Sequence, residues 1–449
     1  MKDLTTGNIY KTFMIFAIPL VLSGLLSQCY NLIDTVIAGK FLGDAGLAAI
    51  GSTSPFISFS SAFFWGYASG ASIYVASLFG ARKYRDIKNA VYHNLITVTL
   101  ASLLFGILAV ICSDGILRFL QVDPLIYHDA KLYFNLYIIG FFFMLLSNNF
   151  LQLLNAFGIS SFPFYMSIIS AVLNVAGNII TITILHWGVA GVAFSTLFSA
   201  LVVDICYLYK LRMCFKEMGV LHEKVHFDFD LVRKITVFSF PSSMQQFIMY
   251  VAGLAISPLV NGIGSHATAA YTVVQQIYSF IANLYQNSSK TLGNYTAQCV
   301  GAGKLTKLNK GVRTGFMQGV FFVAAPILLC TLLPEQVCSL FFPDNYKGEG
   351  LHYAILFARF YLPFILFNVI NNLFHSFYRG TASMKLLVSL TATGAVARIV
   401  CSIIFVHFFG MQGVYIGWVL SWIAESVLAL WTYFSGAWKK DLPKYEVSL

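Results

Sequence analysis

Long runs of apolar residues, separated by short polar or charged segments, make up most of this 449-residue chain. The runs reach about 20 residues or more, enough for an α-helix to cross a hydrocarbon core of roughly 30 Å. The two-residue alternation that marks a membrane β-barrel does not occur in them. The pattern therefore predicts an all-α integral membrane protein.

The runs predict twelve transmembrane helices. Two of them, 46–79 and 268–300, are long enough that we expect them to tilt or to project from the bilayer. The composition agrees, because 58% of the residues are hydrophobic and only 10% are charged. The predicted spans lie near residues 11–37, 46–79, 90–112, 131–155, 163–184, 188–210, 234–260, 268–300, 312–333, 350–377, 384–407 and 411–434.

Short sequences in the first half of the chain return in the second half after about 221 residues. FAIP (16–19) returns as FSFP (238–241), WGVAGV (187–192) returns as FGMQGV (409–414), and Gly43 returns as Gly264. Each repeat carries an even number of spans, so both repeats begin on the same side of the membrane. This predicts two parallel-repeat six-helix bundles.

The predicted domains follow from this repeat. They are an N-terminal bundle (1–209), a cytoplasmic linker (210–233), a C-terminal bundle (234–435) and a cytoplasmic tail (436–449). Repeats of this kind commonly enclose a substrate path between the bundles, so the architecture favours a transporter.

The net charge of +10 indicates orientation in the membrane. When alternate loops are assigned to one side, most lysines and arginines fall together, and only Lys40, Arg118, Lys131 and Lys347 fall opposite. This positive-inside bias predicts a multi-pass membrane protein with both termini in the cytoplasm. The basic charge thus indicates orientation and not a partner: we expect the protein to lie in the lipid bilayer and to bind no nucleic acid.

Motifs for chemistry on a cofactor are not found in the sequence. There is no phosphate-binding glycine-rich loop and no cluster of cysteine and histidine at metal-ligand spacing. We therefore expect a protein that is not an enzyme, that has no cofactor and that does not hydrolyse ATP. Energy for transport is then expected from an ion gradient or from another subunit.

Three carboxylates lie well inside predicted spans: Asp34, Asp204 and Glu425. A charge in a span is costly and normally faces a cavity or a partner. Asp34 follows Gln28 and Asn31 at steps of three residues, so the three share one broad helix face. Asp204 lies nearer a span end, where we expect it to reach the interface or a lysine.

Further polar side chains recur at helical spacing in several spans. They indicate a substrate cavity, although hydrogen bonding between helices is the alternative explanation. Lys290 and Arg398 are deep enough that we expect each to pair with another group or to meet an anion. The predicted cavity residues are Gln28, Asn31, Asn148, Gln152, Gln275, Asn283, Gln286, Lys290 and Arg398.

The order of these motifs resembles one known family over essentially the whole chain. FAIPL near the start, YNLIDTVIAGKFLG (30–43), LFGARK (78–83) and GVAG (188–191) are similar to the multidrug and toxic compound extrusion (MATE) family, prokaryotic type. The resemblance implies a cation-coupled antiporter of the cell (inner) membrane. In such a protein protons or sodium ions flow in as amphipathic, often cationic, small molecules flow out.

The resemblance also implies a coupling site. Its ion- and proton-binding aspartate falls on Asp34, and the rest of its cluster falls on Asn174, Asn178 and Thr196. The family's helix-bending proline falls on Pro19. Asn178 departs from the pattern, because relatives usually carry aspartate there. With one carboxylate fewer, a sodium site is expected to weaken, whereas a single proton on Asp34 stays feasible. No metal other than sodium is expected.

Two other functions fit parts of the sequence. A flippase for a lipid-linked sugar, from the same superfamily, fits the deep cations Lys290 and Arg398, whereas Asp34 fits a cationic substrate. A non-transporting membrane receptor or scaffold leaves the duplicated bundles unexplained. Ion-dependent flux after reconstitution distinguishes both from an antiporter.

Overall fold

The computed structural model describes residues 1–343, 346 and 348–442. Lys347 and the last part of the predicted tail, residues 443–449, lie outside the described residues.

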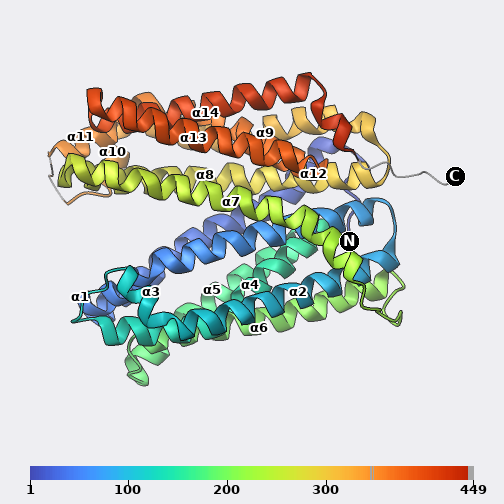
Figure 1. Ribbon diagram of the computed structural model, residues 1–449, viewed down its shortest axis with the longest axis horizontal. Coiled ribbons are helices and arrows are strands. Elements are labelled where there is room, and N and C mark those ends of the chain that lie inside the picture. The colour runs from blue at the N-terminus through green and yellow to red at the C-terminus, as the bar shows by residue number, and fades with distance from the viewer. Residues whose placement is uncertain (344–345, 347, 443–449) are drawn as a thin grey trace. The chain divides into compact units, whose positions relative to one another are not determined.

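Figure 1 shows long helices joined by short connections. Fourteen α-helices and five short π- or 3₁₀-helical segments make up the described part of the chain. They are α1 (Ile9–Gly80), α2 (Tyr84–Ile111), α3 (Ser113–Phe119), α4 (Tyr127–Ala156), α5 (Ser161–Ile179), η1 (Ile180–Ile184), α6 (Val189–Glu217), α7 (Phe229–Ile263), α8 (Ser265–Gly301), η2 (Leu305–Lys307), α9 (Leu308–Leu332), α10 (Pro334–Ser339), α11 (Glu349–Leu356), η3 (Phe357–Tyr361), η4 (Leu362–Phe364), α12 (Ile365–Gly380), α13 (Met384–Phe409), α14 (Met411–Phe434) and η5 (Ala437–Asp441).

The twelve predicted spans are all present as helix. Within the described residues, ten helical segments are long and apolar enough to cross a membrane. One of them, α1, contains two spans that meet at Gly43, whose φ of 68° and ψ of −170° are not helical. The twelfth span is α8, which is too polar to count by composition because it carries Gln275, Asn283, Lys290 and similar residues.

The internal repeat is also visible in the backbone. Gly43 and Gly264 have φ values of 68° and 135°, and each lies where one span ends and the next begins. Gly188 and Gly410 precede α6 and α14 with nearly equal dihedral angles, φ 58° and ψ −135° against φ 55° and ψ −129°. Positive φ is costly for a residue with a Cβ, so glycine recurs at equivalent turns. The all-α membrane fold with an internal repeat is therefore confirmed.

The chain forms two compact units that share two helices. The first unit comprises Met1–Asp3 and Leu22–Ser243, and the second comprises Leu4–Val21 and Met244–Leu449. The start of α1 thus packs with the second unit, and the start of α7 packs with the first. In both helices the change of unit comes two residues after a proline, Pro19 and Pro241. The predicted domain boundaries at 209 and 234 stay a prediction.

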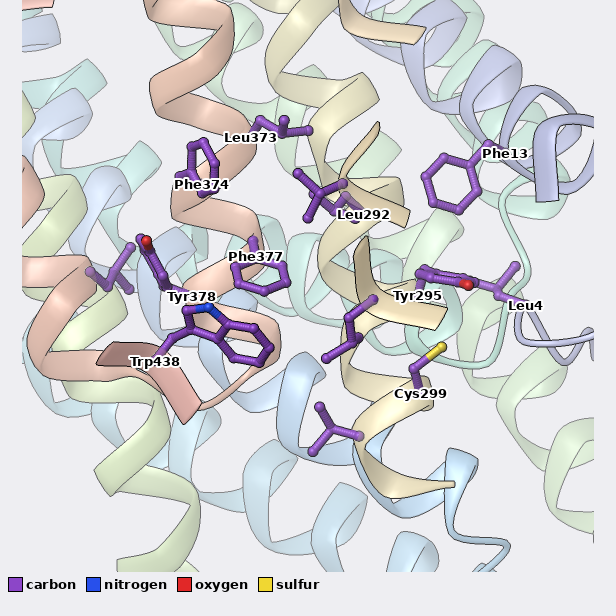
Figure 2. Close-up of a cluster of buried hydrophobic side chains, with 14 of the residues drawn as sticks. Leu4, Phe13, Leu292, Tyr295, Cys299, Leu373, Phe374, Phe377, Tyr378 and Trp438 are labelled. Carbon is purple, nitrogen blue, oxygen red and sulfur yellow. The ribbon is translucent and has the colours of Figure 1, made fainter. Parts of the chain in front are cut away.

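An apolar cluster explains why Leu4–Val21 belongs to the second unit (Figure 2). Phe13 of α1 packs edge-on against Tyr295 of α8, with ring centroids 5.0 Å apart. Phe377 of α12 packs in the same way against Trp438, also at 5.0 Å. Such edge-to-face pairs are favourable geometries for aromatic rings. Of these pairs, Phe13–Tyr295 joins the start of α1 to α8, and Phe377–Trp438 joins α12 to η5 within the same cluster.

Helices α13 and α14 pack closely because small residues line their contact. A Cβ added to Gly413 would lie 2.2 Å from the backbone carbonyl of Phe405, and one added to Gly417 would lie 2.2 Å from Oγ of Ser402. Small residues spaced four apart allow helix backbones to approach in membranes.

Gly413→Leu is therefore expected to separate α13 from α14. Overpacking of this kind destabilises by about 1–3 kcal/mol, so the thermal unfolding temperature in detergent should fall clearly. Gly262→Leu is the matched control, because no atom lies within 4 Å of its added Cβ. Equal unfolding temperatures for the two variants would contradict the close packing.

Candidate functional site

The first unit brings Asp34 of α1 together with polar residues of α5 and α6. Asn178 Nδ2 donates hydrogen bonds to Asp34 Oδ1 and to Asn174 Oδ1, the second at 2.9 Å. Asn174 Nδ2 in turn donates to Thr196 Oγ1 at 3.0 Å. The four residues predicted as the coupling site are thus joined in one chain of hydrogen bonds. Their role in coupling stays a prediction.

One donor of this chain, the NH₂ group of Asn178, points toward the carboxylate. Thr196 Oγ1 donates to the carbonyl of Val192, so it accepts from Asn174, and Asn174 accepts from Asn178. Asn174 and Asn178 are fully buried, whereas Asp34 is only half-buried. Asn178 Oδ1 is buried without a hydrogen-bond partner among the described residues. The arrangement stabilises one negative charge at Asp34 and leaves one free amide oxygen close to it.

The helix spacing explains this geometry. Asn174 and Asn178 are four residues apart on α5, so they lie on one face, and both can reach toward α1 and α6. Directly after them α5 widens into the π-helical turn η1, a feature frequent at functional sites. Thr181 of this turn lies within hydrogen-bond distance of Ser195 of α6, at 3.2 Å. Asn174 of α5 and Thr181 of η1 therefore both face α6.

Tyr30 is a member of this cluster that the sequence did not single out. Its side chain hydrogen-bonds to those of Thr196 and Asn174, and it lies close enough to Asp34 to interact electrostatically. Tyr30 lies four residues before Asp34, on the same side of α1, which is the signal that could have identified it.

The expectation for Asp204 is wrong. It reaches neither the interface nor a lysine, because only 4% of the residue is exposed and its partner is Ser147 of α4, whose Oγ donates to Oδ1 at 2.6 Å. Its second oxygen is buried without a hydrogen-bond partner in the part of the chain that the structure describes. A buried aspartate with a single neutral partner is costly, so Asp204 is a further polar site in the first unit.

The predicted cavity residues are divided between the two units. The first unit contains Gln28, Asn31, Asn148 and Gln152, and the second contains the other five. Of the first group, Asn31 is exposed, Gln28 and Asn148 are half-buried, and Gln152 is buried. Their place in a shared cavity stays a prediction.

In the second unit the predicted polar residues make contacts mostly within α8. Gln275 Nε2 donates to the hydroxyl of Tyr271 at 3.1 Å, and Asn283 Oδ1 accepts from Asn287 at 2.5 Å. Lys290 Nζ donates to Asn287 Oδ1 at 2.8 Å. Gln286 is exposed.

Arg398 and Pro19 complete the predicted residues. The guanidinium of Arg398 lies 4.3 Å from the ring centroid of Trp418, a cation–π contact, so among the described residues it contacts an aromatic ring. Pro19 lies inside continuous helix in α1. Its predicted bending therefore stays a prediction.

The sequence profile of the MatE family matches residues 19–180 and 241–404, one match in each half of the chain. The chain belongs to the MATE family. The family assignment predicted from the motifs is confirmed, and the protein is a multi-pass membrane transporter.

Curated relatives match this MATE transporter over nearly their whole length. It is 24% identical to the probable multidrug resistance protein YoeA of Bacillus subtilis (strain 168), over 96% of this chain and 95% of the relative. It is also 24% identical to the probable multidrug resistance protein YpnP of the same organism, with 97% of each chain covered.

Solved structures share its fold. A multidrug resistance MATE family transporter of the MOP superfamily, in an outward-facing conformation, superimposes with a TM-score of 0.88 at 22% identity, covering 98% of this chain and 99% of that one. A MOP superfamily transporter from Pyrococcus furiosus Vc1, described as having a binding pocket of reverse polarity, superimposes with a TM-score of 0.89 at 21% identity, covering 97% and 98%.

Proposed function

We propose that this MATE transporter exports amphipathic, cationic small molecules by alternating access, in exchange for inward-moving protons. The observation that carries the proposal is the half-buried carboxylate of Asp34, held by Asn178 within a buried chain of neutral donors. The names of the relatives YoeA and YpnP, both probable multidrug resistance proteins, support a drug-like substrate.

The mechanism rests on one negative site that two cations compete for. With Asp34 ionised, the site attracts a cationic substrate. A proton that binds Asp34 cancels this attraction, because the neutral carboxyl no longer offers a charge, and the neutral form costs less in an apolar setting. The same proton weakens the hydrogen bond from Asn178, which leaves α1 free to repack near Pro19 and release the substrate outward.

A proton suits this site better than a sodium ion. Asn178 directs its NH₂ group toward Asp34, whereas a hard cation needs several oxygen ligands, preferably charged. In the membrane orientation that the charge bias predicts, both termini lie in the cytoplasm of a cell with an inner membrane, and proton entry runs down the usual gradient.

The test is efflux of a fluorescent lipophilic cation from proteoliposomes under an imposed proton or sodium gradient. The proposal predicts efflux that follows the proton gradient and changes little with sodium. Efflux at a rate independent of both gradients would contradict ion coupling. Absence of any dye movement would contradict export of cationic compounds.

A second candidate is a flippase for an anionic, sugar-linked lipid. The observation that favours it is the pair of cations inside the second unit, Lys290 and Arg398, which have neutral partners in the contacts described above. In this case the double variant Lys290→Gln/Arg398→Gln should abolish transbilayer movement of a fluorescent pyrophosphate-linked lipid in vesicles. Asp34→Asn should leave this movement unchanged.

A further inference from the structure

A second buried carboxylate lies in the second unit, paired with a histidine. His375 of α12 and Glu425 of α14 approach to 2.7 Å between Nε2 and Oε1. His375 is 3% exposed and Glu425 is 8% exposed, so both are removed from bulk water. Neither the family resemblance nor the coupling site in the first unit accounts for this pair.

The direction of the hydrogen bonds around the pair can be deduced from a single arginine. A guanidinium only donates, so Gln245 Oε1 is the acceptor of the 3.0 Å bond from Arg379. The NH₂ group of Gln245 must then face His375, whose Nδ1 lies 3.4 Å from Gln245 Nε2. Nδ1 therefore accepts, and the ring proton lies on Nε2, directed at Glu425.

The other side chains that contact the pair are neutral. Asn371 Nδ2 donates to the second carboxylate oxygen at 3.2 Å, and Ser426 Oγ donates to Asn371 Oδ1 at 2.6 Å. Thr391 Oγ1 lies 3.3 Å from His375 Nε2. Gly394 of α13 leaves room for the acid, because a Cβ there would lie 2.7 Å from Glu425 Oε2.

Among the described residues, few charged and titratable groups face the pair. Arg379 is the cation, on α12 itself, and it interacts electrostatically with Lys290 of α8. Tyr285 of α8 interacts with Glu425, and its hydroxyl donates to that of Tyr278. From α7 and α13 the described contacts are the neutral side chains of Gln245 and Thr391. Arg379 is therefore linked to the pair through the neutral side chain of Gln245 in the contacts of the described residues.

We propose that His375 and Glu425 form a second proton-binding site, in the second unit, whose state is sensed by Gln245 and Arg379. This proposal rests on the proposed function, since it adds a second proton to the same transport cycle. One proton from water binds Nδ1 of His375 and makes an imidazolium held by Glu425. On release, the N–H bond breaks and the proton returns to water.

Binding at Nδ1 forces a change at Gln245. Two N–H donors would then face each other, so the Gln245 amide must turn until its oxygen accepts from His375. Its NH₂ group then faces Arg379, which loses this acceptor. Gln245 lies on α7, two residues past the point where this helix passes from the first unit to the second. The proton thus changes the contacts of a helix that belongs to both units.

The donor set favours a proton over a metal ion. One oxygen of Glu425 accepts from the N–H of His375, and the other accepts from the NH₂ group of Asn371. Both oxygens are therefore occupied by N–H donors and are not arranged as ligands of a metal ion. Among the described residues no cluster of histidine, cysteine and carboxylate side chains could hold a metal. An imidazole–carboxylate pair inside a membrane protein is instead typical of proton relays.

The direct test is solid-state NMR of ¹⁵N-histidine-labelled protein in lipid bilayers, recorded as a function of pH. The proposal predicts one histidine with its proton on Nε2 at high pH and on both nitrogens at low pH. His375→Gln should remove this signal, and Glu425→Gln should change its pH dependence, because the imidazolium then lacks its carboxylate partner. A His375 signal that keeps one tautomer throughout would overturn the proposal. His352→Gln and Glu335→Gln are the matched exposed controls.

A transport experiment distinguishes failure of this proposal from failure of the proposed function. In proton-driven dye efflux, Glu425→Gln should lower the rate roughly tenfold at a given gradient, and Glu335→Gln should not. If wild-type protein moves no dye but His375 titrates as predicted, the proposed function fails and the proton site stands. If efflux is normal in Glu425→Gln but lost in Asp34→Asn, the site in the first unit stands and the role of the pair in transport is wrong.

Discussion

Asp34→Asn is expected to abolish proton-driven efflux of a lipophilic cation. The substitution keeps the shape of the side chain but removes the carboxylate that accepts a hydrogen bond from Asn178. Loss of a charge on which a step depends typically costs roughly 100-fold or more in rate. The measurement is the initial rate of dye efflux from proteoliposomes at a fixed proton gradient.

A matched control uses another aspartate of α1. Asp44 is exposed and lies just past the break at Gly43, so Asp44→Asn should leave the efflux rate unchanged. Thermal unfolding in detergent should be similar for both variants, since each is isosteric with aspartate. Normal efflux by Asp34→Asn would place coupling elsewhere in the protein.

Asn178→Asp is expected to change the ion that drives transport. The substitution replaces the NH₂ donor beside Asp34 with a second carboxylate. Two carboxylates at this distance repel, so the site must hold a proton or a cation between them. Oxygen ligands with more negative charge favour hard cations such as sodium. We therefore expect sodium-stimulated efflux, with an affinity for sodium roughly tenfold higher than in the wild type.

The sodium dependence of dye efflux, measured without a proton gradient, checks this prediction. Asn261→Asp, which adds a carboxylate at an exposed position near the end of α7, is the control and should not respond to sodium. If Asn178→Asp remains insensitive to sodium, the amide of Asn178 is not what excludes this ion.

Most of the fold could be predicted because apolar runs and repeated motifs determine it. The break at Gly43 and the matching turn at Gly264 lie between predicted spans, as expected for residues that must adopt positive φ. The division of the units could not be predicted in this way. Leu4–Val21 packs with the second unit through contacts such as that of Phe13 with Tyr295, and such tertiary packing leaves no local pattern.

The candidate site was only partly accessible from the sequence. Asp34, Asn174 and Asn178 could be found because an isolated acid in a span and two amides four residues apart are visible in the chain itself. The pairing of His375 with Glu425 could not, because these residues lie on different helices and meet only after folding. Glu425 was noticed as an acid inside a span, but its partner is set by the packing of α12 against α14.

The most direct test of proton antiport is whether movement of the substrate by itself drives protons in the opposite direction. Proteoliposomes loaded with a pH-sensitive dye are given a gradient of a lipophilic cation and no ion gradient. Proton antiport predicts that in wild-type protein protons move opposite to the substrate and change the internal pH. In Asp34→Asn the internal pH should not change. Substrate flow without any change of internal pH in the wild type would contradict proton antiport.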